Sequence, residues 1–154
     1  MPEPDRSVNH ATFVAERTYE ASPQRVFAAW ADPEAKARWF GSPDQGVAEY
    51  ELDFRVSGRE FNRGTVEGQE YTYEARYQDI VPNERIVYAY DMHVGAQRIS
   101  VSLGTVQLEP EGHGTRLTYT EQGAYLDGLD TAEQRQSGTG GLFDALAEEL
   151  ARQR

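Results

Sequence analysis

The chain has 154 residues, a length typical of one domain, and carries 26 acidic against 15 basic residues, for a net charge of −11. Such an acidic surface repels phosphate backbones and anionic lipid headgroups, which argues against nucleic-acid or membrane-surface binding. The absence of cysteine excludes disulfides, thiolate catalysis and zinc–thiolate sites. No apolar run approaches the roughly 18 residues that span a bilayer, and residues 1–10 lack the apolar core of a signal peptide. We therefore expect a cytoplasmic protein.

The N-terminal residues are polar and include two prolines. We expect a flexible tail over residues 1–10 and a single domain over residues 11–154. Residues from Ala11 to Tyr19 alternate in size and polarity, which predicts a first strand.

Two helix-start signals follow this strand. In Ser22-Pro23, and again in Asp32-Pro33, a polar residue that can accept a backbone N–H precedes a proline, which suits the first helical position. Gly41 marks the end of the helix that begins at Asp32-Pro33. The sequence therefore predicts two short helices.

From Val47 onward, apolar and polar residues alternate with a period of two between turn residues. Short turns between successive strands make the predicted sheet antiparallel, and a strand-rich run followed by a helix indicates the α+β class. The predicted strands cover residues 47–56, 60–66, 71–81, 86–92 and 97–108, and a last strand contains Leu117 and Tyr119.

The predicted strand over residues 97–108 changes phase halfway. Its apolar residues from Ile99 to Leu103 lie on one phase, whereas Val106 and Leu108 lie on the other. Because Gly104 lies at the change, we predict a β-bulge there that bends the strand.

A long C-terminal helix is predicted after a loop over residues 122–130. Thr131 is the expected N-cap, and Gln134 completes a capping-box pattern three residues later. Because one face of the sheet must be covered, we expect this helix to pack on it. Its apolar stripe consists of Leu142, Phe143, Leu146 and Leu150.

Several short motifs, taken in their order and spacing, resemble the Hsp90-ATPase-activator-homologue-like family. This family belongs to the START-like or Bet v 1-like superfamily, also labelled SRPBCC or polyketide cyclase/dehydrase-like. The resemblance covers nearly the whole chain. The motifs are Arg17 to Trp30, Trp39-Phe40-Gly41, Asp53 to Gly58, Tyr77 to Arg85 and Thr120 to Ala124.

The resemblance implies a helix-grip fold. In this fold a curved antiparallel sheet of about seven strands wraps around a long C-terminal helix, with two short helices after the first strand and a cavity between sheet and helix. The resemblance implies no particular reaction. Many relatives have a Gly-Trp pair in the last helix where this chain has Gly138-Thr139, so an aromatic lining near the start of this helix does not carry over.

Tyrosine is abundant, with nine in the chain. Several tyrosines on one strand face could stack on an aromatic ligand and bind its oxygens through their hydroxyls. Alternatively, tyrosine simply suits half-buried strands. With the cavity that the resemblance implies, the predicted ligand-binding residues are Trp39, Phe40, Phe54, Tyr73, Tyr77, Tyr88, Tyr90, Gly138, Leu142 and Leu146.

Three glycines interrupt the C-terminal helix between Ser137 and Gly141. Each glycine costs a helix interior up to about 1 kcal/mol relative to alanine. The missing side chains could leave space for a ligand, or the helix could begin or kink here. The segment is no phosphate loop, because no lysine follows the glycines and no strand precedes them.

No set of catalytic residues is recognisable in the sequence. Asp79 and Glu121 each interrupt a strand-like stretch and could transfer protons if they face a cavity, although strand alternation could equally turn them toward solvent. His93 has no second histidine nearby, so a metal site has little support. We expect no metal and no cofactor.

The leading hypothesis is a binding protein for a small apolar ligand, aromatic or lipid-like, held between sheet and helix. The alternative is an enzyme of the cyclase or lyase type that transfers protons in the same cavity. A further alternative, suggested by the family name, is a chaperone-interacting protein. A homodimer is possible, and neither nucleic acid nor membrane is an expected partner.

Overall fold

The computed structural model describes residues 6–153. Within this range, no helix is long and apolar enough to cross a membrane. The helices are α1 (Pro23–Ala31), α2 (Pro33–Phe40), the short 3-10 helix η1 (Pro43–Gln45) and α3 (Ala132–Arg152). The strands are β1 (Val8–Tyr19), β2 (Val47–Leu52), β3 (Arg59–Val66), β4 (Gln69–Val81), β5 (Arg85–Val94), β6 (Gln97–Glu111) and β7 (Gly114–Leu126).

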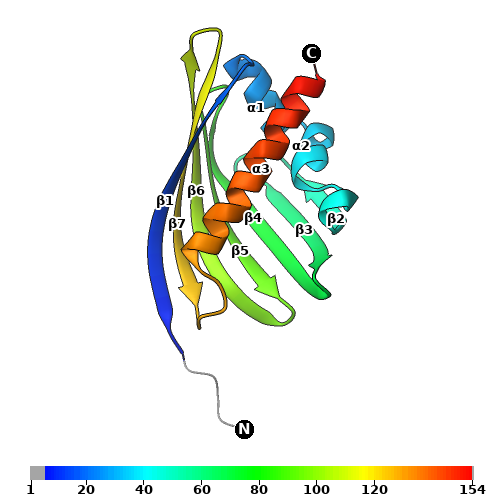
Figure 1. Cartoon of the computed structure of the whole chain (residues 1–154), viewed down its shortest axis with the longest axis vertical. Helices are drawn as coiled ribbons and strands as arrows, with labels where there is room; N and C mark the ends of the chain where they lie inside the picture. The colour runs from blue at the N-terminus through cyan, green and yellow to red at the C-terminus, as the bar shows by residue number, and fades with distance from the viewer. Residues whose placement is uncertain (1–5, 154) are drawn as a thin grey trace.

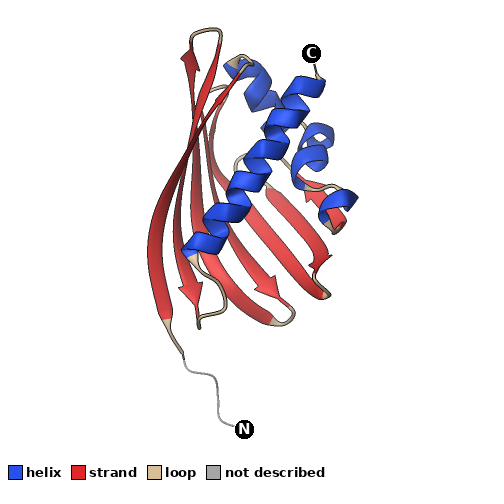
Figure 2. Ribbon diagram, in the orientation of Figure 1, coloured by secondary structure: helices blue, strands red, loops and turns tan. Residues whose placement is uncertain are grey.

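The seven strands form one antiparallel sheet in the order β1-β7-β6-β5-β4-β3-β2. Strands β2 to β7 pair in chain order, and β1 joins the sheet beside β7. The sheet curves around α3, which crosses its concave face, while α1 and α2 lie beside the C-terminal half of α3 (Figures 1 and 2). The predicted α+β helix-grip fold is thereby confirmed.

The predicted helix starts are confirmed by their capping bonds. The Ser22 hydroxyl accepts from the Arg25 N–H at 3.2 Å, and the Asp32 carboxylate accepts from the Glu34 N–H at 3.1 Å. For α3, the Thr131 hydroxyl accepts from the Gln134 N–H at 3.1 Å.

The capping box predicted for α3 differs in its second half. The backbone N–H of Thr131 donates to the Asp130 carboxylate at 2.7 Å, so Asp130 takes the place expected of Gln134. The Gln134 side chain instead lines a cavity. Asp130 is therefore held at the start of α3.

The bulge predicted at Gly104 is wrong. Gly104 pairs in register with Tyr88 and Glu121, and the register shift between β5 and β6 instead leaves Ile99 without a partner residue. Beyond Ile99, every second residue from Ser100 through Gly104 to Leu108 faces the concave side of the sheet. Leu103 therefore lies on the outer face, where it is 38% exposed.

Gly104 has a packing role instead. A Cβ atom there would lie 2.8 Å from the Tyr119 hydroxyl oxygen and 2.8 Å from Cζ of Tyr88. Because no such contact is tolerated, the absence of a side chain lets the two rings occupy the concave face above β6.

Several predicted boundaries also shift. Strand β1 begins at Val8, so residues 8–10 are not tail; the first five residues of the predicted tail lie outside the described range. Strand β2 ends at Leu52 rather than near residue 56. Strand β7 continues to Leu126, and its pairing with β1 and β6 shortens the predicted loop.

Candidate functional site

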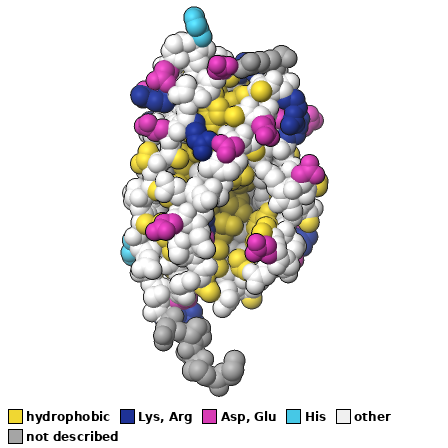
Figure 3. All heavy atoms as spheres, viewed as in Figure 1, with side chains coloured by type: hydrophobic (Ala, Val, Ile, Leu, Met, Phe, Trp, Pro, Cys, Tyr) yellow, Lys and Arg dark blue, Asp and Glu magenta, His cyan; other side chains and the backbone are white. Residues whose placement is uncertain are grey.

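A cavity of about 580 Å³ lies between the concave face of the sheet and α3. It opens to solvent beside α3, where Figure 3 shows hydrophobic side chains on the floor of a hollow. Its lining comprises Trp30, Trp39, Phe40, Gln45, Val47, Asn62, Val66, Tyr71, Tyr73, Tyr88, Tyr90, Met92, Tyr119, Glu121, Asp130, Gln134, Arg135, Gly138, Thr139, Gly141, Leu142 and Phe143.

Glycines of α3 border this cavity without interrupting the helix, which is continuous over 21 residues. A Cβ atom at Gly138 or Gly141 would meet no atom within 4 Å, apart from its immediate neighbours in the helix, so open space adjoins both positions. At Gly140, by contrast, a Cβ atom would lie 3.3 Å from Arg17. The interpretation that the helix begins or kinks here is wrong, because α3 runs straight through this segment (Figure 1), and the missing side chains leave space.

Aromatic rings form the opposite wall. The ring centroids of Tyr73 and Tyr90 are 4.8 Å apart, and those of Phe40 and Tyr73 are 5.1 Å apart. Trp39 continues the wall, with its ring centroid 5.9 Å from that of Phe40. The side chains come from β4, β5 and α2, so the sheet and a helix together build an apolar surface for a ligand.

One end of the cavity holds a buried carboxylate among tyrosine hydroxyls. Glu121 of β7 is 1% exposed and accepts from Tyr90 at 2.8 Å, from Tyr119 at 2.6 Å and from Tyr125 at 3.3 Å. Burial and the adjacent carboxylate raise the pKa of all three hydroxyls, that of Tyr125 to about 12. They therefore remain protonated donors at neutral pH.

Arg135 of α3 supplies the positive charge at this end. Its guanidinium lies 3.5 Å from Glu121 and 2.7 Å from Asp130, and it also donates to the hydroxyls of Tyr90 and Ser100, each at 2.8 Å. Burial alone lowers the pKa of Arg135, but Tyr90 and the two carboxylates raise it more. The guanidinium stays charged and joins the first turn of α3 to the sheet.

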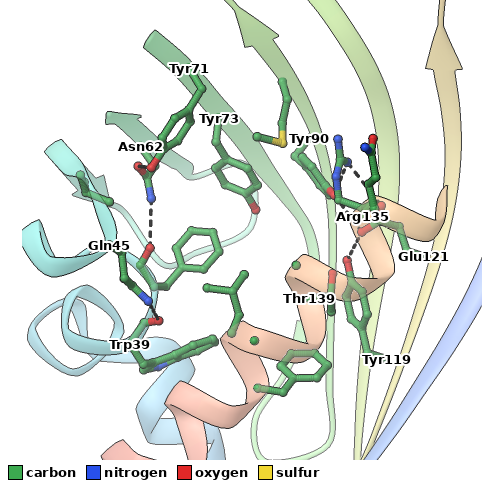
Figure 4. A pocket seen from close by; sticks show the side chains of 18 of the residues that line it. Trp39, Gln45, Asn62, Tyr71, Tyr73, Tyr90, Tyr119, Glu121, Arg135 and Thr139 are labelled. Carbon is green, nitrogen blue, oxygen red and sulfur yellow. Dashed lines mark hydrogen bonds and ion pairs between the residues drawn. The ribbon is translucent and has the colours of Figure 1, made fainter. Parts of the chain in front are cut away.

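The other end of the cavity is polar but uncharged (Figure 4). The Asn62 amide donates to the carbonyl oxygen of Phe40 at 3.0 Å and accepts from the Tyr71 hydroxyl at 3.2 Å. Gln45 donates to the carbonyl oxygen of Trp39 at 2.6 Å. These amides position the aromatic wall.

A second buried carboxylate lies behind this wall and does not line the cavity. Glu60 of β3 is 1% exposed, accepts from Tyr50 and Tyr77, and pairs with Lys36 at 2.9 Å. Burial lowers the pKa of Lys36, against the opposing effect of Glu60. The ammonium group also lies 4.5 Å from the centre of the Phe40 ring, so the pair supports the wall from outside.

Most of the predicted ligand-binding residues do line the cavity, although their binding role stays a prediction. The expectation that Phe54, Tyr77 and Leu146 line the cavity is wrong, because none of them borders it. Tyr77 donates to Glu60, and Phe54 packs on the Tyr77 ring at 4.9 Å. Leu146 is fully buried in the core. The residues that line the cavity as expected are Trp39, Phe40, Tyr73, Tyr88, Tyr90, Gly138 and Leu142.

The two candidate carboxylates point to opposite faces of the sheet. Glu121 faces the cavity, whereas Asp79 is 44% exposed and pairs with Arg85 at 2.6 Å. A register shift leaves Gln78 without a partner residue, so Ile80 rather than Asp79 takes the inward phase after Tyr77. The candidate acid–base role of Asp79 has no geometric basis.

Sequence reasoning missed Asp130, Arg135 and Tyr119 at the charged end. A signal for two of them was present. Arg135 precedes Gly138 by three residues and Leu142 by seven, which places all three on one helix face. Tyr119 precedes Glu121 by two residues in one strand, so both share a face. Asp130 carries no comparable pattern.

A curved sheet closed by a C-terminal helix, with an aromatic cavity between them, defines a helix-grip protein of the START-like or Bet v 1-like superfamily. Residues 20–152 match the family described as Activator of Hsp90 ATPase homolog 1-like protein. The chain belongs to this family. Ligand binding is known in this fold family.

Solved structures agree with this assignment. The chain is 45% identical to a putative uncharacterized protein from Rhizobium leguminosarum, with a TM-score of 0.91 over 96% of this chain and 99% of that one. It is 53% identical to the Mll3558 protein from Rhizobium loti, with a TM-score of 0.87 over 93% and 99%. Ara h 8.0201 shares the fold at 16% identity, with a TM-score of 0.72 over 94% and 99%. A comparison with curated proteins found no match.

Proposed function

We propose that this protein binds a small, largely apolar molecule, aromatic or lipid-like, in the cavity between the sheet and α3. The observation that carries the proposal is the cavity itself, which Gly138 and Gly141 line together with the aromatic wall and where a Cβ atom on either glycine would meet no other part of the chain within 4 Å, apart from its immediate neighbours in the helix. At about 580 Å³, the cavity falls within the range of about 300–1,000 Å³ usual for small-molecule sites.

Apolar contact would supply most of the affinity, at about 25 cal/mol per Å² of apolar surface buried. The rings of Tyr73 and Tyr90 offer flat faces on one side, and Leu142 with Phe143 offers aliphatic and aromatic contact on the other. The two polar ends then orient the ligand along the cavity. This division between apolar walls and a few polar groups is typical of small-molecule sites.

The substitution Gly138→Leu tests the proposal. The leucine enters the open space and should weaken the binding of Nile red, an uncharged apolar dye, by about tenfold or more, because about 2 kcal/mol of apolar contact is displaced. It should not destabilise the fold, since leucine favours a helix over glycine. Dye fluorescence measures the affinity, and native mass spectrometry of freshly purified protein detects a retained ligand.

Ser137→Leu is the matched control, because Ser137 is exposed on the same helix and does not line the cavity. It should leave dye binding unchanged. The proposal fails if neither Nile red nor any apolar compound binds, or if Gly138→Leu binds the dye as well as the unchanged chain does.

A second candidate function is proton transfer on the bound molecule, favoured by the burial of Glu121 at the end of a hydroxyl chain. The Tyr88 hydroxyl lies 3.2 Å from that of Tyr119, which donates to Glu121. An enzyme of the cyclase or lyase type would use this chain to remove a proton from the ligand. Deuterium exchange of a bound ketone, followed by NMR in heavy water, should then be lost in Glu121→Gln.

The chaperone interaction suggested by the family description stays a prediction, and reproducible recovery of Hsp90 in a pull-down would support it. A homodimer likewise stays a prediction, for which light scattering on the purified chain is the measurement.

A further inference from the structure

The charges along the cavity do not balance. Among the described lining residues, two are acidic, Glu121 and Asp130, and one is basic, Arg135. Arg135 is already within ion-pair distance of both carboxylates. Taken as two negative charges and one positive, the lining carries a net charge of −1, in a chain whose net charge is −11.

Among residues 6–153, Arg135 is the one cation that lines the cavity. Lys36, the only lysine in the sequence, pairs with Glu60 and does not line the cavity. A ligand carboxylate would have to leave water and enter a net negative end, where the one cation among the described lining residues, Arg135, is already shared. Each of these steps costs free energy.

The direction of the hydrogen bonds is also constrained. An ionised carboxylate only accepts, so Tyr90, Tyr119 and Tyr125 must each donate their one proton to Glu121. With its proton committed, Tyr119 can only accept from Tyr88, whose hydroxyl lies 3.2 Å away. The order of donation therefore runs from the cavity toward Glu121.

Tyr73 ends this chain in the cavity. Its hydroxyl points into the cavity (Figure 4), and Tyr73 and Tyr88 both line the cavity. Because Tyr88 gives its one proton to Tyr119, the Tyr88 oxygen keeps its lone pairs and can only accept. A ligand therefore meets an acceptor at this point.

We propose that the cavity selects molecules that are uncharged or cationic and that carry a hydroxyl or ammonium donor, and that it rejects carboxylates and other anions. This selection rests on the proposed function, because it concerns the same cavity. The ligand donor would meet the Tyr73 and Tyr88 oxygens, and an ammonium group would gain further from the surrounding tyrosine faces. Free fatty acids, although apolar, fall outside the selected class.

Three compounds with one apolar skeleton test the selection: biphenylmethylamine, biphenylmethanol and biphenylcarboxylate. Each is titrated at neutral pH and low salt against the full chain, directly by calorimetry and by displacement of Nile red. We expect the ammonium and the alcohol to bind at least about tenfold more tightly than the carboxylate. Repulsion between the carboxylate and one uncompensated negative charge of the lining lowers the affinity by about this factor.

The outcomes separate the two proposals. A carboxylate that binds as tightly as the alcohol overturns the selection but leaves the proposed function in place. Nile red that binds but is displaced by none of the three also overturns the selection, because the charged end then contributes nothing. If the dye and all three compounds fail to bind, the proposed function falls, and the selection with it.

Asp130→Asn provides a matched variant. Asparagine keeps an acceptor for the Thr131 N–H that Asp130 now binds, so α3 stays capped, while Arg135 keeps Glu121 as its partner. The preference for the ammonium over the carboxylate should fall about tenfold. Glu148→Gln, on the exposed face of α3, makes the same change in net charge outside the cavity and should leave the preference unchanged. An unchanged preference in Asp130→Asn would falsify the selection.

Discussion

Two carboxylates of this protein are buried in the same manner but in different places. Glu60 and Glu121 are each 1% exposed, accept from tyrosine hydroxyls and pair with one cation. Glu60 faces Lys36 behind the aromatic wall, whereas Glu121 and its partner Arg135 border the cavity.

The difference lies in what surrounds each pair. The Glu60 cluster, which consists of Glu60, Lys36, Tyr50 and Tyr77, is closed, with one cation for one carboxylate. The Glu121 cluster, which consists of Glu121, Arg135, Asp130 and their tyrosines, has an excess negative charge and a hydroxyl chain that leads into the cavity. Burial of a charged group therefore does not by itself mark a functional site. An unbalanced charge beside open space is the more specific sign.

Alkaline pH should break both clusters and produces the largest effect that we expect. The pKa of every one of the nine tyrosines is raised, chiefly by burial. The unfolded chain therefore releases these protons first. The contribution of these tyrosines to the free energy of unfolding is fully present below about pH 10. It is lost above that pH, by up to about 1.4 kcal/mol per pH unit for each fully buried tyrosine.

Phenolate absorbance measured against pH checks this prediction and separates the clusters. Tyr125, whose pKa is raised to about 12, should ionise before Tyr50 and Tyr77, which should ionise only as the chain unfolds. Lys36 acts in the opposite direction, because its lowered pKa favours folding as pH rises, but it is one group against nine. Nine tyrosines titrating near pH 10 in the folded protein would contradict the burial of both clusters.

Lys36→Met should cause the next largest effect. It removes the cation 2.9 Å from Glu60 and leaves a carboxylate at 1% exposure without compensation. We expect a loss of about 3–5 kcal/mol in the free energy of unfolding, measured with urea. Adding Glu60→Gln to the same chain should recover part of it, because the uncompensated charge is then gone.

Arg85→Met is the control for this substitution. It breaks the ion pair with Asp79, in which both side chains are at least 44% exposed, and should cost less than about 1 kcal/mol. Equal losses in Lys36→Met and Arg85→Met would mean that the Glu60 cluster is hydrated rather than closed.

The fold was largely predictable because its signals are local. The proline-linked caps at Ser22 and Asp32 and the period of two along the strands each depend on neighbouring residues, and these predictions hold. The bulges were not predictable, because whether Gln78 or Ile99 is left unpaired depends on the strand alongside. The bulge at Gln78 in the pairing of β4 with β5 also places Asp79 on the outer face of the sheet.

The cavity was predictable in part for the same reason. Gly138 and Leu142 follow the helix period and Tyr88 and Tyr90 follow the strand period, so the sequence could place each pair on one shared face, and the structure shows that these faces line the cavity. The Glu121 cluster could not be assembled, because its members come from β5, β7, α3 and the loop before α3, and they meet only in the folded chain. Phe54 and Tyr77 have inward patterns but pack behind the wall.

The substitutions Tyr77→Phe and Tyr119→Phe compare the two clusters most directly, with the smallest expected effects. Each removes one hydroxyl from a buried carboxylate, at 2.9 Å from Glu60 and 2.6 Å from Glu121, and each should cost about 1–3 kcal/mol of stability by urea unfolding. Their effects on ligand affinity should differ. In Tyr119→Phe the Tyr88 hydroxyl loses its acceptor and can turn its proton toward the cavity.

A ligand hydroxyl then meets a donor instead of an acceptor, so biphenylmethanol should bind about three- to tenfold more weakly to Tyr119→Phe. Its affinity for Tyr77→Phe should stay unchanged, because the Tyr77 hydroxyl is bound to Glu60 outside the cavity. Calorimetric titration of both variants makes the comparison. If both lose affinity equally, the Glu60 cluster also acts on the ligand, and the separation of a closed cluster from a cavity-facing one does not hold.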